Sequence, residues 1–173
     1  MTQMLQDSVQ AAYQKSGDSP EHTTPQVISS ATSPETEIRQ LDGVEHLGWH
    51  GQHIATIIRA NFLPEKTTFV TPDSYYQQAG CVVYPQGGQV QRHLHLPLQR
   101  HLVGTPETLI IRKGCAEVSL YSLDKEYLTT VVLHEGDIIL LVSGGHGITF
   151  REDTVLCEIK QGPYTGLKEK EIF

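Results

Sequence analysis

From about residue 37 onward, short runs of apolar and β-branched residues alternate with turn signals built from Gly, Pro, Asp and Asn. Runs of this length, bounded in this way, are typical of β-strands. The predicted strands are 52–61, 67–70, 80–84, 89–95, 107–113, 116–123, 127–133, 137–142, 147–151 and 154–160. Many short strands with regular turns and no central helix predict an all-β class, either an antiparallel barrel or a double-sheet sandwich.

The composition changes once along the chain. Residues 1–36 are rich in Ser, Thr, Gln and Pro, so they have little apolar surface to bury. Residues 1–15 have the spacing of a short amphipathic helix, which is marginal by itself. We therefore expect a mobile or weakly helical tail over 1–36 and one domain over 37–173, with its core at about 78–165. A chain of 173 residues is long enough for one barrel with a real core.

Side chains able to bind a metal ion gather in one stretch of the pattern. On a strand over 89–95, His93 and His95 point to the same face, and a hairpin returns Glu107 on the next strand to meet them. His146 follows the predicted strand 137–142 as a fourth donor. Convergent nitrogen and oxygen donors of this kind predict a divalent metal site. Histidine pairs on strands are also common as ordinary polar surface residues.

The alternation of side chains along a strand predicts the lining of the interior. Gln91 faces inward with the two histidines, whereas Val90 and Leu94 face outward and require a cover from the same chain or a second subunit. On the following strand, Glu107 shares a face with two aliphatic residues, Leu109 and Ile111. This predicts a pocket with polar donors near its mouth and an aliphatic interior, suited to a small, partly polar molecule.

The arrangement of strands and metal-binding side chains resembles the cupin superfamily over roughly residues 78–165. The first cupin motif combines a glycine, a His-x-His pair, a glutamate and a second glycine. The matching residues here are Gly87, His93, His95, Glu107 and Gly114. The gap of eleven residues between His95 and Glu107 is longer than in the family. His101 lies in this gap and is an alternative to His95 as a ligand if the loop folds back.

The second cupin motif has a counterpart in Gly136, Gly144 and His146, with Val142 where proline is usual and the histidine one residue early. The segments 158–164 and 168–173 are similar to a small group of uncharacterised bacterial cupins, often encoded near surface-polysaccharide genes.

The resemblance implies a jelly-roll barrel, the cupin-type double-stranded β-helix, that forms a homodimer. It also implies a divalent metal ion (Fe, Mn, Ni, Zn or Cu) held by His93, His95, Glu107 and His146. The leading expectation is an isomerase or epimerase acting on a sugar derivative. The alternatives are a metal-dependent dioxygenase and a non-enzymatic small-molecule or sugar-binding module.

Three further residues are candidates for the substrate pocket. Gln91 faces the predicted interior, Arg100 lies near its predicted mouth, and Tyr84 is a candidate proton donor or stacking surface. An arginine there would bind a carboxylate or phosphate through two hydrogen bonds. Exposed loop arginines and simple packing tyrosines are the commoner cases.

Charge and cysteine content narrow the partners. Thirteen Lys and Arg against twenty Asp and Glu give a net charge of −7, which argues against nucleic acid and anionic membranes. No run approaches a membrane span, and no signal segment precedes the domain, so we expect a soluble, cytoplasmic protein. Cys81 and Cys157 lie in apolar strands, which predicts buried, reduced thiols.

Overall fold

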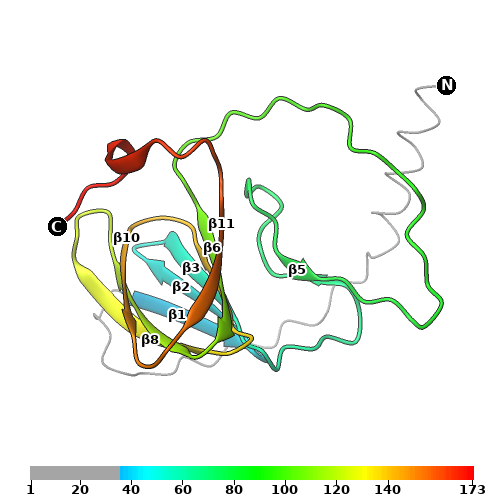
Figure 1. The fold of residues 1–173 in the computed structure, drawn as a ribbon, viewed down its shortest axis with the longest axis horizontal. Coiled ribbons are helices and arrows are strands. Elements are labelled where there is room, and N and C mark those ends of the chain that lie inside the picture. Colours follow the sequence, from blue (N-terminus) through cyan, green and yellow to red (C-terminus); the bar gives the residue numbers. More distant parts are fainter. Residues whose placement is uncertain (1–35) are drawn as a thin grey trace.

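The computed structural model describes residues 36–173, apart from the side chains of 167 and 168, and the regular secondary structure of this part of the chain consists almost entirely of strands (Figure 1). The strands are β1 (Thr36–Leu41), β2 (Val44–Trp49), β3 (Gln52–Ile58), β4 (Thr68–Phe69), β5 (Gly80–Cys81), β6 (Glu107–Lys113), β7 (Cys115–Tyr121), β8 (Tyr127–His134), β9 (Ile138–Leu141), β10 (Gly145–Phe150) and β11 (Val155–Lys160). One 3₁₀ turn, η1 (Gly166–Glu169), precedes the C-terminus. The all-β prediction is confirmed.

The strands form two main antiparallel sheets. The larger has the order β1-β2-β3-β9-β6-β11, the smaller has the order β10-β7-β8, and β4 pairs with β5 separately. The two sheets curve around a common interior (Figure 1). This arrangement is compatible with a β-sandwich or jelly roll.

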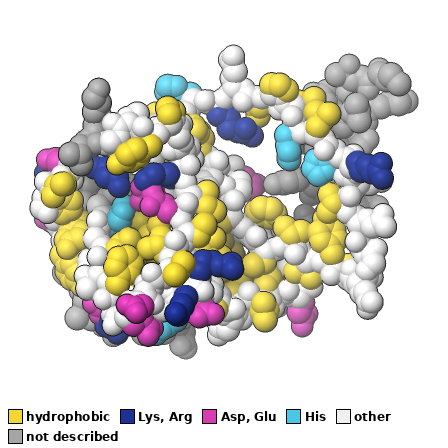
Figure 2. All heavy atoms as spheres, viewed as in Figure 1, with side chains coloured by type: hydrophobic (Ala, Val, Ile, Leu, Met, Phe, Trp, Pro, Cys, Tyr) yellow, Lys and Arg dark blue, Asp and Glu magenta, His cyan; other side chains and the backbone are white. Residues whose placement is uncertain are grey.

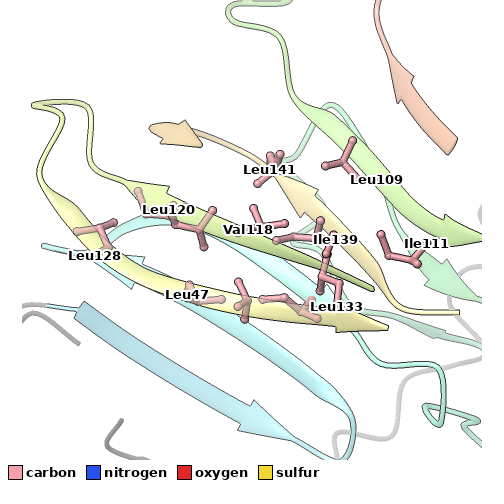
Figure 3. Packing of buried hydrophobic residues seen from close by; sticks show 14 residues of the cluster. Leu47, Leu109, Ile111, Val118, Leu120, Leu128, Leu133, Ile139 and Leu141 are labelled. Atoms are coloured by element: carbon pink, nitrogen blue, oxygen red, sulfur yellow. The ribbon is translucent and has the colours of Figure 1, made fainter. Parts of the chain in front are cut away.

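The hydrophobic core fills the space between these sheets (Figure 3). In β7 the buried positions alternate, with Ala116, Val118 and Leu120 all nearly inaccessible to solvent. Their partners from the larger sheet include Leu109 and Ile139. Alternation of this kind follows from the pleat of a strand, which sends every second side chain to the same face.

A β-bulge in β3 interrupts this alternation. Leu47 pairs with Ala55 and Gly48 pairs with His53, so Ile54 has no partner on β2. As a result, Ile54 and Ala55 both enter the core. The extra residue reverses the parity of the strand and places His53 on the outer face of the sheet.

The prediction of a strand over residues 89–95 is wrong. Residues 82–106, which we call the arc, contain no strand and run in a wide curve away from the sheets (Figure 1). The reason is that β6 already pairs with β9 on one side and β11 on the other, so no edge remains beside Glu107 for a hairpin partner. Figure 2 shows hydrophobic, basic and histidine side chains set along the arc.

Two further expectations need correction at the level of single residues. Cys157 is exposed, because it lies opposite Ile110 on the outer side of β11, whereas Cys115 at the start of β7 is the buried cysteine. Cys81 is only half-buried rather than buried, and Cys81, Cys115 and Cys157 are all free thiols. The predicted tail over 1–36 lies outside the described residues except for Thr36, which already belongs to β1.

Candidate functional site

Two of the four predicted ligands meet where the two sheets face each other, at an end of the fold that solvent reaches. Glu107 begins β6 and is 7% exposed, on the same inner face as Leu109 and Ile111. His146 lies on β10 in the other sheet, paired with the core residue Leu120, rather than beyond a strand end. Glu107 Oε2 and His146 Nε2 are 3.2 Å apart. The two sheets therefore bring this pair together across the interior, although 38 positions separate the residues in the chain.

The strand β11 adds an ammonium group and a second carboxylate to this pair. Lys160 is the register partner of Glu107, and its Nζ lies 3.2 Å from Glu107 Oε1. Lys160 also forms an ion pair with Glu158, which lies opposite Leu109 and so shares the inner face. We call these four residues the Glu107 cluster: Glu107, His146, Glu158 and Lys160.

The charges in the cluster stabilise one another. The hydrogen bond with Glu158, followed by the one with Glu107, raises the pKa of Lys160 above its ordinary value. The same hydrogen bond from Lys160 lowers the pKa of Glu158. Both groups are therefore charged at neutral pH. The side chain of His146 is 30% exposed and that of Glu158 is 40% exposed, so solvent reaches the cluster.

Aromatic residues flank the same end of the fold. The ammonium group of Lys160 lies 5.8 Å from the centre of the Tyr164 ring, a cation–π contact. The ring of Phe173 meets that of Tyr121 edge-to-face at 5.3 Å and lies against Gly145, the residue before His146. Below the cluster, Leu109 and Leu141 begin the apolar core. Polar groups therefore lie at one end of an aliphatic interior, but Gln91, His93 and His95, which were predicted to share that interior face, are not among them.

The other two predicted ligands lie on the arc. The rings of His93 and His95 are 5.2 Å apart and edge-to-face, and His93 Nδ1 is 2.8 Å from the carbonyl oxygen of Gln91. Both side chains are exposed. Among residues 36–173, no group of three or more His, Cys, Asp or Glu side chains is arranged to hold a metal ion. Gln91, Arg100, Tyr84 and His101 are also exposed residues of the arc.

The Glu107–His146 pair nevertheless has the spacing of two ligands on one ion. Ligands bound side by side at roughly 2.0–2.1 Å from a divalent cation lie about 3 Å apart. The pair's separation of 3.2 Å agrees with this. Lys160 occupies the other oxygen of the glutamate, so an ion at this pair would approach Oε2 and the imidazole only.

Glu158 and Lys160 were missed by the sequence reasoning. The signal was present, because Leu156, Glu158 and Lys160 alternate along a predicted strand and therefore share a face. What the sequence lacked was the pairing of β11 with β6, which places that face beside Glu107. His46 and His53, which lie outside the predicted metal-binding motif, belong to a separate polar cluster described below.

Comparison of the chain with protein-family models, curated proteins and solved structures found no match. Within the part of the chain that the structure describes, no helix is long and apolar enough to cross a membrane.

Proposed function

We propose that this chain is a cupin-type protein that binds a small, partly polar molecule at the Glu107 cluster and isomerises or epimerises it, with a sugar derivative as the leading substrate class. The observation that carries the proposal is the contact between Glu107 and His146, 3.2 Å apart and supplied by opposite sheets. A carboxylate and an imidazole at hydrogen-bonding distance are suited to accepting and returning a proton.

Isomerisation or epimerisation next to a carbonyl requires three contributions. A base removes a proton from carbon, an acid delivers one, and a cation stabilises the negative oxygen that develops between the two steps. Glu107 and His146 are the acid–base pair in this proposal. Lys160, held charged beside Glu107, is the group that stabilises the developing oxyanion. The apolar residues below, including Leu109, limit access of water from the core side.

The cupin resemblance also implies a divalent metal ion. Glu107 and His146 would supply two ligands, and His93 and His95 would complete the set if the arc folds over this end of the fold. If bound there, such an ion would supply Lewis-acid chemistry to a substrate carbonyl. Iron, manganese, nickel, zinc and copper are all compatible with imidazole and carboxylate ligands.

Elemental analysis of the full chain, purified without a metal-affinity tag, tests the metal. We expect near-stoichiometric metal in the parent and a large loss in His93→Ala and His146→Ala, because removing one of four ligands weakens a site strongly. His101→Ala is the matched control on the arc. An empty parent protein would refute the metal site. If His101→Ala loses the metal and His95→Ala retains it, His101 and not His95 is the metal ligand.

Deuterium uptake tests the reaction even when the product is not identified. Aldoses, ketoses and their phosphates are incubated with the protein in D₂O, and NMR detects exchange at the carbon next to the carbonyl. We expect Glu107→Gln and His146→Gln to slow exchange by about 100-fold or more. His134→Gln, on an exposed position of β8, is the matched control. Exchange that is unaffected by Glu107→Gln would refute the catalytic role.

A non-enzymatic binding module is the second candidate. The observation in its favour is that both oxygens of Glu107 are already engaged, one by His146 and one by Lys160. Such a closed network can orient a ligand without transferring a proton. Saturable binding of a sugar derivative at the cluster, with no deuterium uptake, would select this function.

A further inference from the structure

A pocket with polar groups in its floor lies on the outer face of the larger sheet, away from the Glu107 cluster. It is a cavity of about 460 Å³ between β1–β3 and the segment 69–75. Its lining includes Arg39, His46, Gln52, His53, Phe69 and Tyr75. A volume of this size is in the range of small-molecule sites. We call it the outer pocket.

The bulge in β3 builds the floor of the outer pocket. His46 is the register partner of Thr56, so both side chains lie on the outer face. His53 joins them because the unpaired residue Ile54 reverses the parity between positions 53 and 55. Thr56 is fully buried beneath the two histidines. A strand without the bulge would direct His53 toward the core.

A continuous series of hydrogen bonds connects these residues to the opposite wall. His46 Nδ1 lies 3.0 Å from Thr56 Oγ1, and Thr56 Oγ1 lies 2.9 Å from His53 Nε2. His53 Nδ1 in turn lies 2.6 Å from the hydroxyl of Tyr75. The series therefore runs from β2 through β3 to the segment that closes the pocket.

One carbonyl group sets the direction of the whole series. His53 Nε2 is 2.9 Å from the carbonyl oxygen of Ala55, which only accepts, so this nitrogen carries the hydrogen. In neutral His53, Nδ1 then accepts from the Tyr75 hydroxyl. Thr56 Oγ1 shares this same His53 N–H with the Ala55 carbonyl, and the hydroxyl hydrogen of Thr56 is directed to its other partner, His46 Nδ1. Neutral His46 consequently carries its hydrogen on Nε2.

The surroundings keep this series uncharged. Burial, followed by the nearby His53 and the Arg39 guanidinium, lowers the pKa of His46. Burial also lowers the pKa of His53, against the opposing effect of its hydrogen bond to Ala55. Arg39 and Glu37, which both line the pocket, form an ion pair at 3.4 Å and offset each other's charge. The lining has no uncompensated charge at neutral pH.

We propose that the outer pocket is a second ligand site that takes an uncharged polyhydroxylated molecule, a sugar or sugar-like polyol. His46 Nε2 donates to one hydroxyl, and the Tyr75 oxygen, whose hydrogen is directed to His53, accepts from another. Hydroxyl groups suit both ends, because each can donate and accept. Phe69 and the Tyr75 ring supply apolar surface for the C–H faces of such a molecule. A carboxylate or phosphate would lack a donor for the Tyr75 oxygen.

Long-range ¹H–¹⁵N NMR of the histidine side chains in the full chain tests this site. D-glucose, D-galactose and D-mannose are the probes, and sodium acetate is the charged comparison. We expect at least one sugar to move the His46 Nε2 signal in a saturable manner, and acetate to leave it in place. Tyr75→Phe, which keeps the ring, should weaken the binding about five-fold through the loss of one hydrogen bond. Tyr76→Phe is the matched control on the neighbouring, exposed tyrosine.

Each other outcome overturns the proposal. No response to any of the three sugars would do so, as would a response to acetate alone or full affinity in Tyr75→Phe. Gln52→Ala, which removes a second lining residue near a turn, provides an independent variant if Tyr75→Phe fails to fold. Glu107→Gln separates the two sites. If the sugar still shifts the His46 Nε2 signal in this variant, the sugar binds in the outer pocket. If the shift is lost, the sugar binds at the Glu107 cluster instead. The proposal for the outer pocket can therefore be refuted without refuting the proposed function of the Glu107 cluster, and the proposed function can be refuted without refuting the outer pocket.

Discussion

At the scale of single residues, Asp137 joins the turn before β9 to the residues that follow β3. It is 4% exposed and accepts hydrogen bonds from the Arg59 guanidinium and from the backbone N–H groups of Ala60 and His134. Arg59 also binds Glu45 at 2.6 Å, so two carboxylates share one cation. Removing a buried acceptor leaves its donors without partners, and this is more costly than losing an exposed ion pair.

We expect Asp137→Ala to lower the free energy of unfolding by about 3 kcal/mol, measured by urea denaturation. Glu171→Ala is the control, because Glu171 pairs with Lys125 on the surface and should change stability by no more than about 0.5 kcal/mol. Equal effects of the two substitutions would contradict this account of Asp137.

The two histidines of the outer pocket predict how stability depends on pH. Their pKa values are lowered in the folded chain from an ordinary value of 6.5. Above 6.5 both states are neutral and the stabilising contribution is complete. As the pH falls below 6.5, the unfolded chain binds protons that the folded chain excludes, so stability is lost toward the lower, folded pKa values. Thermal unfolding between roughly pH 7 and 5 should show this fall, and His46→Gln should reduce its slope. An unchanged slope would refute it.

The candidate site was predictable residue by residue only where strand parity was enough. Glu107 faces inward because it shares a parity with Leu109 and Ile111, and this could be predicted from sequence. The position of His53 could not be, because a single unpaired residue in β3 reverses its face. Bulges have little signature in one sequence, since they depend on which strand lies opposite.

At the scale of elements, the turn between β9 and β10 depends on Gly144. Its φ angle is +76°, and a Cβ there would lie 2.2 Å from the carbonyl oxygen of Tyr121. Gly144→Ala should therefore displace the start of β10, which carries His146, and lower the unfolding free energy by more than about 1 kcal/mol. Gly147→Ala, where a Cβ would meet nothing within 4 Å, is the control in the strand that follows, β10. Urea denaturation should separate the two, and equal stability would contradict the argument.

Most strands were predictable because their apolar periodicity is local. The strand at 107–113 was predicted with the observed bounds, and the others from β3 onward were predicted within a few residues. The bounds of the first hairpin, formed by β1 and β2, were not predicted, although Asp42-Gly43 is a strong turn signal. Both of these residues have positive φ. The strand at 89–95 failed for a different reason. Its composition favours a strand, but pairing is decided by available edges, and β6 has none.

At the scale of the whole molecule, sheet order decided which predicted ligands meet. Glu107 and His146 lie in different sheets and approach across the interior, so their contact depends on the fold closing as a whole. His93 and His95 lie on a segment that no sheet holds. Sequence supplies the donors and their spacing, but only the three-dimensional order of the strands shows that β11 completes the cluster with Lys160.

The arc also bears on association. Its exposed apolar side chains include Val90, Leu94, Leu96, Leu98 and Val103, each more than half accessible. A surface of this kind along one segment is typical of a protein interface. We therefore propose that a second copy of the chain covers the arc; the proposal rests on this exposure and not on strand parity, because residues 89–95 form no strand.

Light scattering should then give about twice the monomer mass, because an isologous dimer buries the same apolar surface on both copies. Leu94→Glu should shift the mass toward the monomer, since it places a charge within the covered surface. Leu63→Glu is the matched control, as Leu63 is 85% exposed and lies outside the arc. A monomer at concentrations on the order of tens of micromolar would contradict the dimer, because interfaces of standard size are stable at that concentration. The alternative is then that the arc covers the Glu107 cluster of its own chain. A loss of metal in His93→Ala and His95→Ala would support this alternative.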